Sequence, residues 1–435
     1  MTKILNYYRK ITSKVKHLSS IWWQSDLLRN GAYIYIIAVM GVNFTAVFFH
    51  LIISRIIGPS SYGLLGSMIG MLSVLLVPIS ALQVSVTQAT MRFNSEKPGQ
   101  KASVRKLLSD SVIYSSLTAV LISFFIPNLD NYLKSSNSTP FIFIIVWIPL
   151  ATATAVLQGY LIADLKFKEV GIATLVGNGI FRLVIGTLMV FLGFGVSGAM
   201  FGIVIAQTLT LMMLMINSVS LHAFINVPVK ISLKFRESVL PIFGFLGLTC
   251  FIGIDTFYSR HVLQNFESGL YSAAATTAHL TFIVPATLGT IVFPFLAESG
   301  YKTSSGRKIF RQFLYLTITS ELIIFVIILA APNFLLRALY GVKYIGGSSI
   351  LSILSLESLF IGVTMAMFLL QLAKKSQTTL FVWVPVVSAG AILSRFGHTM
   401  HSITVTMFFI GLFTLIFFTS LNFEFFKTHQ VLHLE

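Results

Sequence analysis

Charge is scarce in this chain. Only 10% of its 435 residues are charged, 55% are hydrophobic, and the mean hydropathy is +0.86. A soluble domain needs far more charge to cover its surface. The composition therefore excludes a soluble enzyme and predicts an integral membrane protein whose main solvent is lipid.

Cysteine and catalytic motifs are also lacking. The single cysteine, Cys250, lies inside an apolar run, so it can form no intrachain disulfide and has no second cysteine for a metal site. The nine histidines are scattered, and the chain has no paired-carboxylate motif, phosphate-binding loop or Cys/His cluster. These absences predict a protein that is not an enzyme and holds no resident metal or cofactor.

Acidic residues are outnumbered by basic ones, 14 to 30, which gives a net charge of +16. The basic residues sit in short segments between apolar runs and form no single binding face, so nucleic acid is not a predicted partner. This distribution is typical of the positive-inside rule of membrane proteins. Residues 1–30 are polar and basic, and we interpret them as a cytoplasmic arm with no cleavable signal peptide.

Twelve apolar runs are long enough to span a membrane, for which roughly 20 residues are needed. With the N-terminus inside, 23 Lys and Arg fall in cytoplasmic segments, six fall in outer segments, and Arg182 lies within a span. The alternation predicts twelve transmembrane helices with both termini cytoplasmic. The runs have approximate limits 31–54, 62–87, 107–127, 139–163, 168–192, 195–220, 237–257, 268–297, 312–335, 347–372, 377–396 and 400–422.

One sequence unit occurs twice. Ser54-Arg55 ends an apolar run and is followed by a short polar link, Gly63 and a second run; Ser259-Arg260 and Gly269 repeat this order about 205 residues later. Pro78 and Pro285 lie at matching depths in the second runs, 15 and 16 residues past those glycines. Such repeats are common in membrane transporters, whose substrate path lies between the halves. The two prolines are therefore predicted hinges, with static kinks as the alternative.

The repeat divides the chain into two lobes. We predict an all-α fold with a six-helix lobe at 31–221, a cytoplasmic linker at 222–236, a second six-helix lobe at 237–422 and a cytoplasmic tail at 423–435. An even number of spans per repeat relates the lobes by a pseudo-two-fold axis along the membrane normal. A monomer is adequate, because the path lies within one chain.

Several short motifs occur in order along the chain. They are Arg55-Ile-Ile-Gly58-Pro59 with Tyr62-Gly63, Leu157-Gln158-Gly159-Tyr160 with Lys166-Phe167-Lys168, Arg182 with Gly193 to Ala199, Asp255 with Gly269 to Ala274 and Phe293-Pro294, and Leu339-Tyr340-Gly341 with Tyr344. Together they resemble the polysaccharide (oligosaccharide) flippases of the MOP superfamily, which share the MATE-like fold.

The resemblance implies a function as well as a fold. Such flippases have a central cavity that opens outward and inward, and they move polyprenyl-pyrophosphate-linked glycans from the cytoplasmic to the outer leaflet of a prokaryotic plasma membrane. Our main hypothesis is alternating access in which the pyrophosphate and sugars enter a cationic central cavity. The resemblance also implies a lipid-linked glycan substrate, contact with membrane lipids, and a polysaccharide polymerase and glycosyltransferases as assembly partners.

Arg182 is the main candidate for substrate binding. A charge at a helix centre costs roughly 2.5–3.5 kcal/mol on the insertion scale, so it usually faces a cavity or a partner. We predict that Arg182 lines the cavity and binds the pyrophosphate, which suits a guanidinium. The alternative is a structural arginine bonded to backbone carbonyls or a carboxylate.

Other substrate-binding candidates carry the same ambiguity. Arg55 and Arg260 are a matched pair that either draws the headgroup outward or snorkels to the interface. His279 is a second headgroup donor or a proton-sensitive group, or a helix-packing histidine. Gln158 and Gln371 contact sugar hydroxyls or, as we favour, bond between helices.

Acidic residues within spans are candidates for ion coupling. Asp255 could hold Na⁺ or H⁺, or could pair with Arg260 or Arg55. Glu321 and Glu357 are proton carriers or counter-charges for Arg182 or His279.

Two other functions are compatible with the sequence. A cation-coupled multidrug exporter of the MATE type shares the fold, but would favour carboxylates facing the cavity, and spans one to six contain no Asp or Glu near mid-membrane. A non-transporting membrane scaffold for glycan assembly would need neither intramembrane charges nor matched prolines.

Overall fold

The computed structural model describes residues 31–96, 104–217, 239–299, 303–374 and 376–423. In these ranges the chain forms helices and no strands, as the sequence predicts. The predicted arm at 1–30, the linker at 222–236 and all but the first residue of the tail at 423–435 lie outside the described residues.

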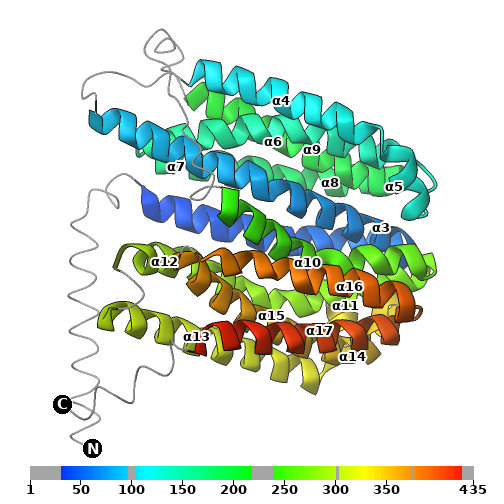
Figure 1. Ribbon diagram of the computed structural model, residues 1–435. Coiled ribbons are helices and arrows are strands. Elements are labelled where there is room, and N and C mark those ends of the chain that lie inside the picture. The colour runs from blue at the N-terminus through cyan, green and yellow to red at the C-terminus, as the bar shows by residue number, and fades with distance from the viewer. Residues whose placement is uncertain (1–30, 97–103, 218–238, 300–302, 375, 424–435) are drawn as a thin grey trace, which may run out of the picture.

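The first half of the chain forms the upper layers of Figure 1. Its helices are α3 (Ala32–Glu96), α4 (Arg105–Ser123), α5 (Ile126–Tyr132), α6 (Thr139–Ala163), α7 (Phe167–Thr174), the π-helix η1 (Leu175–Phe181), α8 (Arg182–Met189), the π-helix η2 (Val190–Phe194) and α9 (Gly195–Asn217).

The second half forms the lower layers. Its helices are α10 (Leu240–Val262), α11 (Asn265–His279), the 3-10 turn η5 (Leu280–Phe282), α12 (Ile283–Ser299), α13 (Ser304–Ala330), α14 (Pro332–Tyr340), the 3-10 turn η6 (Val342–Gly347), α15 (Ser348–Ala373), the 3-10 turn η7 (Gln377–Val382), α16 (Trp383–Phe396) and α17 (Met400–Leu421).

The helices are long and apolar enough for a membrane. Within the described residues, eight helices qualify by length and composition, or nine if α4 and α5, bent by 53°, are one span. Two of the eight are very long, with 64 residues in Tyr33–Glu96 and 50 in Phe167–Ile216. The count of twelve spans stays a prediction.

Both very long helices are interrupted at glycines. In α3, Gly58 has φ 73° and ψ 173°, and Pro59 follows it. In the other, Gly193 and Gly195 have φ values of 93° and 53°. A side chain is strained at positive φ, whereas glycine is not. These breaks lie at links that the sequence predicts between spans, so each long helix doubles back on itself (Figure 1).

Helix α3 joins the two halves. It packs against α6 in the first half and against α10 and α11 in the second. The outward surface is apolar, with Phe124 72% and Phe191 77% exposed, which suits contact with lipid tails. The hinge residues Pro78 and Pro285 lie inside α3 and α12, and their hinge role stays a prediction.

Candidate functional site

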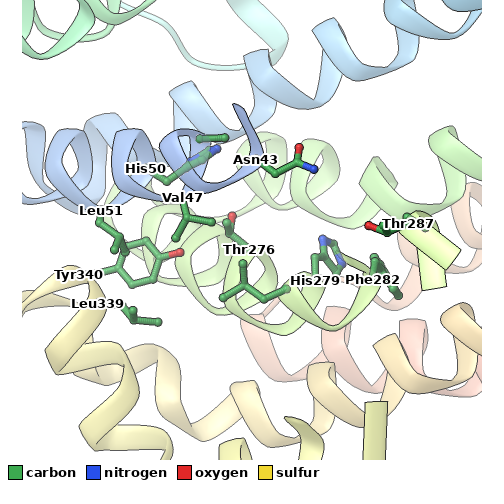
Figure 2. A pocket seen from close by; sticks show the side chains of 13 residues that line it. Asn43, Val47, His50, Leu51, Thr276, His279, Phe282, Thr287, Leu339 and Tyr340 are labelled. Carbon is green, nitrogen blue, oxygen red and sulfur yellow. The ribbon is translucent and has the colours of Figure 1, made fainter. Parts of the chain in front are cut away.

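A cavity of about 330 Å³ lies between the two halves. The first part of α3 forms one wall, α11, η5 and α12 form the other, and the end of α14 covers one end (Figure 2). The lining residues are Asn43, Ala46, Val47, His50, Leu51, Thr276, His279, Leu280, Phe282, Ala286, Thr287, Leu339 and Tyr340.

The polar groups of this cavity come from both halves. Asn43 and His50 lie on α3, whereas Thr276 and His279 lie on α11. His279, one of the predicted substrate-binding residues, stacks on Phe282 with ring centroids 5.2 Å apart. No Arg, Lys, Asp or Glu belongs to the lining that the structure describes. The cavity therefore offers hydrogen-bonding groups on a mainly apolar wall.

Buried tyrosines close one end of the cavity. The hydroxyl of Tyr62 shares a hydrogen bond of 3.0 Å with His50 Nδ1. Its ring packs on Tyr340 and Tyr344, with centroids 5.7 and 5.9 Å away. The Tyr344 hydroxyl donates to the Ser54 carbonyl at 2.8 Å. We call this region, formed by residues 54–63, 133–134, 259–269 and 336–344, the closed end.

Arg182 is not among the residues that line this cavity, and its pyrophosphate-binding role stays a prediction. It is half-buried, its Nη2 donates to the Val42 carbonyl at 3.3 Å, and its guanidinium lies 5.7 Å from the Phe49 ring centroid. Val42 and Phe49 are seven residues apart on α3, as are Asn43 and His50, so each pair marks a face of the helix. Arg182 therefore packs on the neighbouring face of α3, where it interacts electrostatically with His50, and it is not among the lining residues.

Arg260 is a structural arginine in this structure. Its side chain is 3% exposed. Nε donates to the Leu133 carbonyl at 2.8 Å, Nη1 to the Ser60 carbonyl at 3.0 Å and to Ser268 Oγ at 3.2 Å, and Nη2 to the Lys134 carbonyl at 3.2 Å. Burial excludes the snorkelling alternative here, and these bonds occupy the donors that a headgroup would need.

Arg55 is exposed, and its Nη2 donates to the Ala338 carbonyl at the end of α14. The two matched arginines thus bind backbone of the opposite half, and neither lines the cavity.

The predicted glutamines bond between helices, the alternative that the sequence favours. Gln158 Nε2 donates to Thr174 Oγ1 at 3.0 Å, which links α6 to α7. Gln371, 3% exposed, donates to Asn422 Oδ1 at 3.0 Å and accepts from Thr378 Oγ1 at 2.9 Å.

Two of the predicted acidic residues form a buried cluster. Asp255 is 1% exposed, and its Oδ2 accepts a hydrogen bond of 2.8 Å from the Tyr271 hydroxyl. Glu357, also 1% exposed, interacts electrostatically with Asp255. Its Oε2 has no hydrogen-bond partner within the described residues. Two carboxyl groups of different helices thus lie together in the second half.

Glu321 lies apart from this pair. It is fully buried on α13, and neither carboxyl oxygen has a hydrogen-bond partner in the described part of the chain. A Cβ at Gly362 of α15 would coincide with this carboxyl group. The close contact identifies the glycine as the residue that makes room for Glu321.

The ion pairs suggested as alternatives for these acids are absent. In the described ranges, the salt bridges join Arg92 to Glu96 and Lys166 to Asp164. Asp255, Glu321 and Glu357 therefore pair with none of the predicted arginines. In the same ranges, no group of three or more His, Cys, Asp or Glu could hold a metal ion.

Sequence reasoning missed most of the cavity lining. His50 carried a usable signal, because a histidine inside an apolar run is as unusual as His279. Tyr340 belongs to the Leu339-Tyr340-Gly341 motif, whereas Thr276 carried no signal, since threonine is frequent within spans.

Solved structures show which fold this is. The chain resembles the structure titled "Lipid II flippase MurJ, inward closed conformation", with a TM-score of 0.66, 16% identity and coverage of 89% of this chain and 87% of that one. It also resembles an outward-facing MATE multidrug resistance transporter of the MOP superfamily, with a TM-score of 0.59, 15% identity and coverage of 93% and 96%. The predicted MATE-like fold is confirmed.

The comparison with curated proteins gives no match. A family described as "Polysaccharide biosynthesis protein" matches residues 52–349, which is most of the chain. The chain belongs to this polysaccharide biosynthesis protein family, as its motifs indicated, and it has the fold of the MOP transporters.

Proposed function

We propose that this protein is a flippase that moves lipid-linked oligosaccharide across a membrane by alternating access. The observation that carries the proposal is the cavity between the two halves, which has hydrogen-bonding groups on both walls and is closed at one end by Tyr62, Tyr340 and Tyr344. Family membership in polysaccharide biosynthesis and the fold shared with a lipid II flippase support it.

The lining of the cavity suits a glycan headgroup. Hydroxyl, amide and imidazole groups of Asn43, His50, Thr276 and His279 can donate to and accept from sugar hydroxyls. Apolar side chains between them can pack on sugar rings, while the polyprenyl tail stays among the exposed apolar residues of the helices. Imidazole and amide groups would donate hydrogen bonds to the pyrophosphate, whereas the sequence led us to expect cationic side chains in the cavity.

The buried acids Asp255, Glu357 and Glu321 are the groups that we propose for coupling to Na⁺ or H⁺. A carboxyl group buried away from cationic partners can exchange a proton or a cation at modest cost, because it is not held in an ion pair. Such exchange could bias the halves between their two arrangements.

The cellular setting belongs to the same proposal. A flippase for lipid-linked glycan would work in a prokaryotic plasma membrane with both termini in the cytoplasm. A polysaccharide polymerase and glycosyltransferases would consume and supply its substrate. One chain is sufficient, since both walls of the cavity come from it.

The test is flipping of a fluorescent undecaprenyl-pyrophosphate-oligosaccharide in proteoliposomes, under a proton or sodium gradient. We expect the native protein to move the lipid, His50→Ala and His279→Ala to slow it about tenfold or more, and Arg182→Ala to slow it less, because Arg182 lies outside the cavity. His401→Ala is the matched control, since His401 is an exposed histidine on α17.

Other outcomes would identify the alternatives. Export of a cationic dye without movement of lipid-linked sugar would replace the flippase by a MATE-type exporter. A folded protein that moves neither, yet retains polymerase or glycosyltransferases on co-purification, would be a scaffold for glycan assembly.

A further inference from the structure

Two hydrogen bonds at the closed end are related by the internal repeat. Arg55 on α3 donates to the Ala338 carbonyl, and Arg260 on α10 donates to the Leu133 carbonyl. Arg260 follows Arg55 by 205 positions, and Ala338 follows Leu133 by the same 205. The donors and the acceptors are thus both repeat equivalents, so each half holds the other through the same contact.

The acceptor carbonyls lie at equivalent helix ends. Ala338 is in the last turn of α14, and Leu133 caps α5. The last carbonyls of a helix have no partner within that helix and carry its partial negative charge. A guanidinium from the other half satisfies them, so both contacts draw a short helix of one half onto a long helix of the other.

The backbones of the two halves also meet at equivalent glycines. A Cβ on Gly63 would lie 2.9 Å from the backbone nitrogen of Gly269, and a Cβ on Gly269 would overlap the backbone of Pro59. Lys134 adds a contact from the first half, since its Nζ donates to the Leu263 carbonyl at 3.1 Å. The closed end is therefore a symmetric junction of α3, α5, α10, α11 and α14.

This junction controls one end of the cavity. Tyr340 lines the cavity and lies two residues beyond Ala338 on the same helix, so the Arg55 contact holds Tyr340 against Tyr62. Moving α14 away from α3 would separate the two tyrosines and expose the cavity. The Arg260 contacts hold α5 against α10 on the equivalent side.

The chemistry of these contacts suits repeated release. Each joins an arginine to backbone carbonyls and none to a carboxylate, so separation leaves groups that water satisfies readily once the end opens. A buried ion pair would instead leave two uncompensated charges.

We propose that Arg55 and Arg260 form a paired latch that keeps this end of the cavity shut and is released when the end opens. The latch does not depend on what the cavity carries. Its two members differ in strength: Arg55 is exposed with one acceptor, whereas Arg260 is buried with four acceptors from three segments. Arg55 is therefore the member released first.

Side-specific labelling tests the latch. In a Cys250→Ala background, Ala46→Cys places a single thiol in the cavity without removing a hydrogen-bonding side chain. A membrane-impermeant maleimide is added to one face of oriented proteoliposomes at a time. We expect Arg55→Ala to raise the labelling rate from the face of the closed end about tenfold, the order expected for loss of one hydrogen bond to a charged group, and Arg260→Ala to raise it more, because Arg260 has four acceptors.

The control is Arg337→Ala, which removes an exposed arginine beside Ala338 on α14 and should leave the labelling unchanged. Arg55→Lys should stay near native, because one amine can serve one carbonyl, whereas Arg260→Lys should label quickly. Since Arg55 is exposed, its variants keep the test valid even if Arg260→Ala fails to fold.

Unchanged labelling in folded Arg55→Ala would overturn the latch, as would an equal rise from both faces, which indicates general loosening. The test needs no substrate. If the protein moves no lipid-linked glycan but shows the side-specific rise in labelling, the proposed function is wrong and the latch still stands.

Discussion

His50 Nδ1 lies 3.0 Å from the Tyr62 hydroxyl, so a polar group of the cavity is bonded directly to the tyrosines that close it. Both residues belong to α3, on opposite sides of its break at Gly58. A ligand that takes the imidazole as its own partner would therefore compete with the bond between His50 and Tyr62, whose ring packs on Tyr340 and Tyr344 at the closed end. The hydrogen bond between His50 and Tyr62 thus links the lining of the cavity to its closed end.

Removing only the hydroxyl of Tyr62 tests this link. Tyr62→Phe keeps the ring packing on Tyr340 and Tyr344 but removes the hydrogen bonds of the hydroxyl with His50, Thr276 and Tyr340. We expect a loss of about 1–3 kcal/mol in the free energy of unfolding, since each hydrogen bond contributes about 1 kcal/mol. We also expect a several-fold change in flipping rate, measured in proteoliposomes. Tyr315→Phe, at a position 70% exposed on the outer surface, is the control and should change neither quantity. A native flipping rate in Tyr62→Phe would contradict the link.

The Asp255 and Glu357 pair makes a prediction about energy coupling. Asp255→Asn removes the charge and keeps the size, so the site can no longer exchange a cation or proton. We expect transport driven by an ion gradient to fall about tenfold or more, while exchange without a gradient stays within a few-fold of native. Glu96→Gln, at an exposed acid on α3, is the control. Equal losses with and without the gradient would assign Asp255 a structural role through its bond to Tyr271.

The close contact between Glu321 and Gly362 predicts that substitutions of these two residues have non-additive effects on stability. Gly362→Ala places a methyl group where the Glu321 carboxyl lies, and such overpacking costs about 1–3 kcal/mol of stability. Glu321→Ala removes a buried carboxyl without a partner in the described residues and makes room, so the double variant should recover most of that loss. Thermal unfolding in detergent measures each step. Gly390→Ala, where a Cβ meets nothing within 4 Å, is the control. Additive effects would show that the two residues do not compete for the same space.

The break in α3 at Gly58 predicts that a side chain there would strain the backbone without clashing with neighbouring atoms. Gly58 has φ 73° and ψ 173°, a region that essentially only glycine adopts, and nothing lies within 4 Å of an added Cβ, so Gly58→Ala should cost about 1–3 kcal/mol through backbone strain alone. Gly70→Ala is a matched control within the same helix, also with open space, and should be neutral or stabilise by up to about 1 kcal/mol. Equal shifts in the unfolding curves of Gly58→Ala and Gly70→Ala would show that the break does not depend on glycine.

Local patterns predicted the outline of this protein well. Hydropathy and turn residues act over a few positions, so the links at Gly58 and Gly193 could be placed without knowledge of the fold. Repeat spacing alone matched Arg55 with Arg260, although it gave their role as headgroup binding or snorkelling. Of the six predicted substrate-binding residues, the cavity contains His279.

Helix rotation is the reason why the sequence could not say which side chains line the cavity. An adjacent residue on a helix points about 100° away, so a span known only by its limits leaves the facing of each side chain open. Arg182 and His50 show the effect: they interact electrostatically, yet Arg182 packs on Phe49 outside the lining, whereas His50 lines the cavity.

The sequence alone determined that the chain lies in lipid, that its fold is all-α, that it contains a repeat and which family it belongs to. Each of these depends on composition or on spacing along the chain. Tertiary structure decided which polar groups share the cavity and which arginines bind the opposite half. Those contacts join residues such as Arg55 and Ala338, 283 positions apart. They depend on how the two halves pack on each other, which no local pattern records.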